Sequence, residues 1–261
     1  MNDTDKLSGG LPPRSTGYSA GHTQTLAICE GADYKNPNMG FLVRYKRNQV
    51  EGAIASAIGA NDDRSSSELR VRIKRLLEAD RALGCEPTAN DPERTMYAFY
   101  SSNAPGSGLE VWFSVYEAFA LFLALQLQRH GWPQGTVVRI MRRARPTLEP
   151  HHTRILTHDP RRLFDKDAVL RQARPGMLAV DNTDPVFLAI VTGKREHSGS
   201  AHADSVPRAV SACRGEVELM AFTRQQAPAG MSTTSLEVVG HAHRLAQHLG
   251  RTKPRTRGRR R

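Results

Sequence analysis

The sequence predicts an α+β protein on three observations. Four segments between residues 48 and 145 have the apolar patterns of helices. Two aromatic, β-prone stretches flank the turn-forming segment "SSNAPGSG". Apolar runs suited to strands follow residue 150. With 261 residues, 39% of them hydrophobic, the chain is long enough for one large domain or two small ones with cores.

The first two predicted helices begin at capping signals. Asn48 with Glu51, and Ser65 with Glu68, have the spacing in which two side chains satisfy free amides at a helix start. Gly59 ends the first helix. In the second helix, the residues expected to be buried share one stripe: Leu69, Ile73, Leu76, Leu77 and Leu83.

A β-hairpin is expected next, over residues 96–113. Its strands would be Met96–Tyr100 and Leu109–Phe113. Ser114 and Glu117 then form a third capping box. The helix that follows is apolar almost all round, which predicts a central, buried helix.

The fourth helix is expected to run from Pro133 to Pro146 and to be amphipathic. Its apolar stripe is Val137, Ile140, Met141 and Ala144. At 100° per residue, three basic residues fall opposite that stripe, where we expect solvent: Arg139, Arg142 and Arg143.

The rest of the chain predicts a small sheet-containing subdomain. The runs 177–182, 186–192 and 217–223 are suited to strands. Thr234 and Glu237 then predict the capped start of a last helix. The chain is expected to begin with a disordered leader (1–38) and a helical domain with the hairpin (39–149). A partner or oligomerisation subdomain (150–230), a C-terminal helix (231–250) and a disordered basic tail (251–261) follow.

The order helix, turn, helix, hairpin, helix, helix is that of a winged helix, in which the hairpin is the wing. The segment "FSVYEAFALFLALQLQRHGWPQGTVVRIM" resembles the helix pair that follows the wing in MerR-type winged-helix regulators. The resemblance covers about 100 residues and implies a DNA-binding architecture. The tyrosine-rich signature of that family and its long dimerisation helix are not found, so its modes of dimerisation and effector sensing do not carry over.

Two sets of residues are candidates for contact with DNA, and a third possibility is that both basic faces are simply solvated. In the MerR-like arrangement, the second helix enters the groove with Arg70, Arg72, Lys74 and Arg75. In a simple helix-turn-helix arrangement, the fourth helix does so with Gln134, Thr136, Arg139, Arg142 and Arg143. Arginine pairs well with the guanine edge in the major groove.

The tail "RTKPRTRGRRR" has seven basic residues in eleven and no apolar residue. Such a segment forms no core and binds phosphate backbones without sequence preference. The tail residues expected to contact DNA are Arg255, Arg257, Arg259, Arg260 and Arg261.

The function expected is therefore binding of double-stranded DNA, in transcription regulation, by a cytoplasmic protein that could form a homodimer. No membrane partner is expected, because the sequence has no run of 18 apolar residues. The first alternative is a non-catalytic adaptor whose basic tail binds nucleic acid.

We expect no enzyme activity, cofactor or metal. Two histidine groups, His151 with His152 and His158, and His241 with His243, have no Cys or carboxylate arrangement that completes a metal site. A metal-dependent nuclease is a third alternative, on the loose grouping of Asp181, Asp184 and Glu196 with Lys194.

Overall fold

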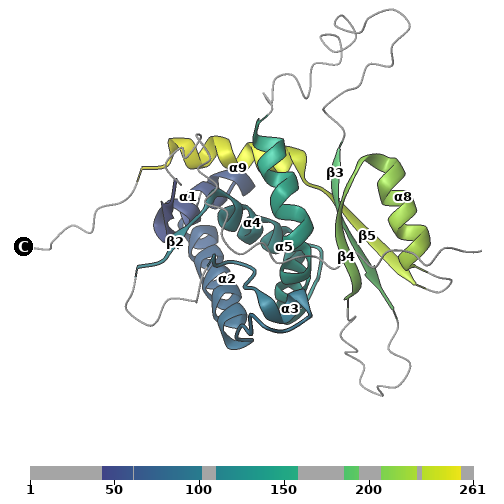
Figure 1. Ribbon diagram of the computed structural model, residues 1–261. Coiled ribbons are helices and arrows are strands. Elements are labelled where there is room, and N and C mark those ends of the chain that lie inside the picture. The colour runs from purple at the N-terminus through teal and green to yellow at the C-terminus, as the bar shows by residue number, and fades with distance from the viewer. Residues whose placement is uncertain are drawn as a thin grey trace, which may run out of the picture. The chain divides into compact units, whose positions relative to one another are not determined.

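The structure, a computed structural model, combines helices with two small antiparallel sheets, which confirms the α+β class (Figure 1). All described residues belong to one compact unit, Gly40–Arg261. The predicted leader, most of the basic tail, and the strand expected at 177–182 lie outside the description. The residues described are 43–60, 62–101, 110–157, 185–193, 207–227 and 231–253.

Five helices make up the first part of the fold: α1 (Arg47–Ile58), α2 (Asp63–Ala82), α3 (Pro92–Thr95), α4 (Val115–Arg129) and α5 (Gln134–Thr157). The predicted central helix is α4, whose residues 116–125 are all buried. Its predicted capping box is confirmed. The Ser114 hydroxyl accepts from the Glu117 amide at 3.1 Å, and the Glu117 carboxylate accepts from the Ser114 amide at 2.7 Å.

The other two predicted capping boxes are wrong, because nearby side chains cap the helices instead. Helix α1 begins one residue before Asn48, and the side chain of Gln49 accepts from the Lys46 amide at 3.0 Å. Helix α2 begins before Ser65, and Asp62 accepts from the Ser65 amide at 2.6 Å. A carboxylate three residues ahead of Ser65 is as good an N-cap as the hydroxyl.

Helix α5 does not end at Pro146, as predicted, but continues to Thr157. Pro146 removes one backbone hydrogen bond. The helix persists because Leu148, His152 and Ile155 are buried and continue its packed face. The predicted domain boundary at residues 149 and 150 therefore lies inside a helix.

The described residues on either side of the expected turn, 96–101 and 110–113, do not pair as the predicted hairpin. Strand β1 (Tyr45–Lys46) pairs with β2 (Trp112–Phe113), so β2 has its partner before α1. The stretch expected as the first hairpin strand is irregular. Its Ala98 and Phe99 amides donate to the Asp80 carboxylate at 3.2 and 3.0 Å, which leaves them no strand partner.

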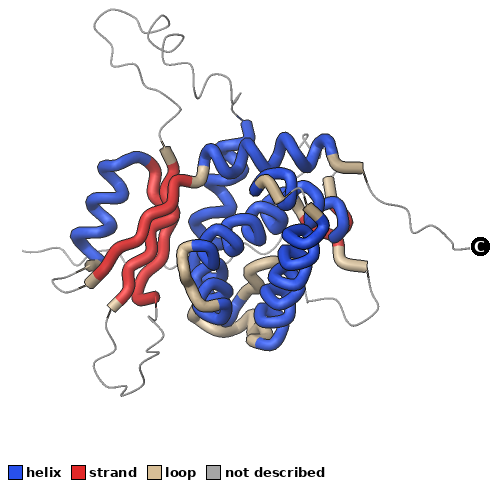
Figure 2. Tube along the Cα trace, turned by 180° about the vertical axis from the view of Figure 1, so that it is seen from behind, coloured by secondary structure: helices blue, strands red, loops and turns tan. Residues whose placement is uncertain are grey.

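The second sheet has the order β4–β3–β5, with all neighbours antiparallel: β3 (Val186–Thr192), β4 (Pro207–Arg214) and β5 (Ser232–Glu237). The strand predicted at 186–192 is confirmed. The strand predicted at 217–223 is wrong, because Gly215, at φ 71°, turns the chain into α8 (Gly215–Gln226). Glu, Leu, Met and Ala in this segment favour a helix. Helices α5 and α8 lie on opposite faces of the sheet (Figures 1 and 2).

The last helix, α9 (Val239–Arg251), returns to pack against α1. The predicted cap at Thr234 is wrong, since Thr234 lies in β5. Glu237 alone caps the helix, accepting from the amides of Val239 and Gly240 at 2.6 and 3.3 Å. One hydrophobic core joins α1, α2, α4, α5 and α9 with one face of β3. It therefore includes residues from both sides of the predicted domain boundary.

Candidate nucleic-acid interface

A tight turn joins α1 to α2 and sets the direction in which α2 leaves. Gly59 ends α1 in the left-handed conformation, at φ 74°, which favours glycine. Asp62 begins α2, and the hydrogen bond from the Ser65 amide lowers the pKa of its carboxyl. The result is a two-helix unit whose turn is fixed by the left-handed conformation of Gly59 and by the Asp62 N-cap.

Helix α2 is packed on one side and exposed on the other. Leu69, Ile73, Leu76 and Leu77 are buried, as predicted, whereas Leu83 is 44% exposed. The basic residues of the MerR-like arrangement all lie on exposed positions: Arg70, Arg72, Lys74 and Arg75. Val71 lies among them, 45% exposed and opposite the buried stripe.

The four basic side chains differ in their neighbours. Arg70 lies 3.8 Å from a Glu51 carboxylate oxygen, and Lys74 lies 3.7 Å from Glu78. Arg72 and Arg75 form no ion pair with any residue that the structure describes. Within the described residues, therefore, no ion pair neutralises either charge.

A third arginine lies close to Arg72. Arg129, at the end of α4, and Arg72 both line a surface hollow of about 370 Å³ beside the turn at Gly59. Arg129 likewise has no ion pair within the described part of the chain. Arg72, Arg75 and Arg129 are called the α2 basic patch below. Asp62 and Glu68 also border the hollow, and Arg75 is not among its lining residues.

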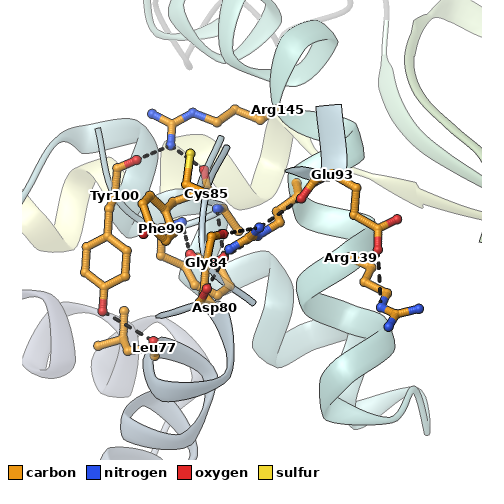
Figure 3. Close-up of polar contacts among 12 residues, drawn as sticks. Leu77, Asp80, Gly84, Cys85, Glu93, Phe99, Tyr100, Arg139 and Arg145 are labelled. Carbon is orange, nitrogen blue, oxygen red and sulfur yellow. Dashed lines mark hydrogen bonds and ion pairs between the residues drawn. The ribbon is translucent and has the colours of Figure 1, made fainter. Parts of the chain in front are cut away.

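The residues of the simple helix-turn-helix arrangement are not presented to solvent together. Thr136 is buried, and the Gln134 amide donates to the Arg75 carbonyl at 3.0 Å. Arg139 and Arg143 both bind Glu93, at 3.2 and 2.8 Å, and Figure 3 shows Arg139 reaching Glu93. Arg143 also donates to the Pro207 carbonyl at 2.7 Å. Of the row predicted to face solvent on α5, Arg139 is exposed, whereas Arg143 is half-buried and Arg142 is buried.

Arg142 departs furthest from prediction, because its side chain is only 1% exposed. Its Nε donates to the Asp80 carboxylate at 2.6 Å, and its Nη1 donates to the carbonyls of Gly84 and Glu93 at 2.8 Å each. Burial raises the pKa of the Asp80 carboxyl, and the bonds from Arg142 oppose that shift. Arg142 thus ties α5 to the end of α2 and to α3.

One signal in the sequence points to this buried pair. Asp80 occupies the position three residues after Leu77 and four after Leu76, on the apolar stripe of α2. A carboxylate on a buried stripe needs a cation or several amide donors. Asp80 has both.

Comparison with known proteins finds no matching family model, no matching curated protein and no matching solved structure. The site is therefore judged on its own geometry. Of the helices that the structure describes, none is both long and apolar enough to cross a bilayer. The tail arginines from Arg255 onward, and the acidic residues considered for a nuclease, fall outside the described residues.

Proposed function

We propose that the chain binds double-stranded DNA through the α1–turn–α2 unit, as a regulator whose mechanism is binding alone. The observation that carries the proposal is the α2 basic patch, in which Arg72 and Arg75 are exposed and form no ion pair with the residues that the structure describes. Arginines without partners gain most from phosphates or guanine edges. The tail adds contacts with phosphate that do not depend on sequence.

The outer face of α2 has the dimensions and chemistry for a major groove. A single α-helix fits that groove, and its exposed side chains contact base edges and flanking phosphates. Arg75 would lie one turn beyond Val71 on the same face, and Arg72 would lie to the side of Val71 near Arg129. The predicted contacts on α5 are withdrawn, because that helix is packed on several sides by α2, α3, α4 and β4.

The test is fluorescence anisotropy on a labelled random-sequence duplex across a potassium chloride series. We expect the double variant Arg72→Ala and Arg75→Ala to lose about two units from the slope of log affinity against log salt. Each phosphate contact contributes roughly 0.9 to that slope, so binding near 0.1 M salt should weaken on the order of 10- to 100-fold.

Two controls make this result specific. The double variant Arg154→Ala and Arg244→Ala removes the same charge from exposed positions outside α2 and should change the slope little. A second chain has the five tail arginines from Arg255 to Arg261 replaced by serine. An unchanged slope in the α2 variant, with all binding lost in the tail variant, would overturn the proposal.

A contact between Val71 and a base would give the protein a sequence preference, which can be tested separately. An apolar side chain in the major groove contacts the thymine methyl group. After selection of a preferred duplex, we expect Val71→Ala to weaken binding by roughly threefold, as for about one buried methyl group. Replacing thymine by uracil should weaken the wild type similarly and the variant hardly at all. Equal sensitivity of both proteins to uracil would contradict a contact by Val71.

A non-catalytic adaptor is the second candidate, and one observation favours it. Helix α8 presents Val217, 86% exposed, and Met220, 51% exposed, on its outer face. The same salt series separates the two functions, because an adaptor with a basic tail depends only on the tail for nucleic-acid affinity.

A further inference from the structure

Helix α8 packs against the sheet with one face and leaves the other uncovered by the described residues. None of its residues is buried. Val217 and Met220, three positions apart, share the outer face with Ala221 and Arg224, which are also exposed. Figures 1 and 2 show α8 on the side of the sheet away from α5, so the helical core does not cover this face.

The charges on α8 are arranged by sign along the helix. Glu216 and Glu218 lie in the first turn, and Arg224 lies in the last. Glu218 accepts from the Arg214 amide at 2.8 Å, so it is engaged at the helix start. Glu216 is exposed and forms no ion pair within the described chain. The outer face is thus acidic at one end, apolar in the middle and basic at the other.

We propose that this face docks on the α8 helix of a second copy of the chain, antiparallel and about a two-fold axis. The axis passes at Met220, midway between Glu216 and Arg224. Each Glu216 then lies opposite Arg224 of the second copy, and the stem of that arginine covers Val217. The surface is complementary to itself in both charge and apolar area, which is what a two-fold interface requires.

The charges also exclude the simplest competing arrangement. Parallel docking in register would bring Glu216 against Glu216 and Arg224 against Arg224, with like charges juxtaposed at both ends. The antiparallel arrangement pairs opposite charges and opposes the two helix dipoles. One 12-residue helix on each side is a small interface, so the dimer is weak and depends on concentration.

The test is sedimentation velocity on the full chain over a dilution series from about 1 µM to several hundred µM, the range in which small interfaces associate. The wild type should pass from a 28.9 kDa monomer toward twice that mass. Val217→Asp should remain monomeric, and far-UV circular dichroism should show an unchanged fold because the position is exposed. Val43→Asp, at an exposed valine before β1, is the matched control and should dimerise as the wild type does.

Charge reversal tests the register. Glu216→Arg and Arg224→Glu alone should each raise the dimer dissociation constant by about tenfold or more, since each places like charges together. The double reversal restores opposite charges and should return the constant to near the wild-type value. A wild type that stays monomeric at every concentration, a dimer that survives Val217→Asp, or a double reversal no better than the single ones would each overturn the proposal.

Discussion

Replacing Arg142 with alanine is expected to lower the free energy of unfolding by about 3–5 kcal/mol, the usual effect of removing one partner of a buried ion pair. Asp80 is fully buried and would lose the cation that compensates its carboxylate, while the carbonyls of Gly84 and Glu93 would lose their donor. Urea unfolding followed by circular dichroism measures the loss. A loss below about 1 kcal/mol would show that the pair is not buried as described.

Two further variants separate the buried pair from ordinary surface charge. Arg139→Ala, in the same helix, removes a half-exposed ion pair to Glu93 and should cost less than about 1 kcal/mol. Asp80→Asn added to Arg142→Ala should recover part of the stability, because a neutral amide needs no cation and its oxygen still accepts from Phe99. No recovery would mean that Arg142 acts through its carbonyl bonds alone.

This pair also bears on the proposed DNA contacts. Arg142 fixes the end of α2 against α3 and α5, whereas the α2 basic patch makes none of these bonds. Loss of DNA affinity in Arg142→Ala should therefore accompany loss of fold. Loss of affinity in the Arg72 and Arg75 variant should leave the unfolding curve unchanged. Unfolding data on the same variants tell structural arginines from binding ones.

The sequence predicted best where the signal is local. The start of α4 depends on Ser114 and Glu117, three residues apart, and both hydrogen bonds are present. The buried stripes of α2 and α5 also follow from helical spacing. The burial of Arg142 does not follow from α5 alone, because the residues that cover it lie about 50 to 60 positions earlier.

The sheet was harder to predict for the same reason. Strand β4 and strand β5 are defined by pairing with β3 over long separations, and β5 has the polar sequence "STTSLE". Edge strands of this kind lack the apolar alternation that marks a half-buried strand. The segment 217–223 is an almost continuous apolar run, which suits a strand as well as a helix. It is helical because intrinsic helix propensity and the turn at Gly215 act in the same direction.

A pH effect is expected from His152, which is 2% exposed and stacks on Phe119 with ring centroids 4.5 Å apart. Burial, with a smaller contribution from His243, lowers the pKa of His152 to about 4 from its ordinary value of 6.5. Between pH 6.5 and pH 4, the unfolded chain therefore binds a proton at this histidine that the folded chain does not bind. The contribution of neutral His152 to the free energy of unfolding is therefore fully present above pH 6.5 and is lost as the pH falls toward 4.

The size of the effect follows from the same two pKa values. Between pH 7 and pH 5 the difference in proton uptake costs about 2 kcal/mol, at 1.36 kcal/mol for each unit. His152→Phe keeps a flat ring beside Phe119 and cannot titrate. Between pH 7 and pH 5 its free energy of unfolding should therefore fall by about 2 kcal/mol less than that of the wild type. The remaining pH dependence should persist, because burial also lowers the pKa of His151 and of His241. His130→Gln is the control, since that imidazole is already exposed. If urea midpoints of His152→Phe and wild type fall in parallel from pH 7 to pH 5, His152 is protonated in the folded protein and its site admits water.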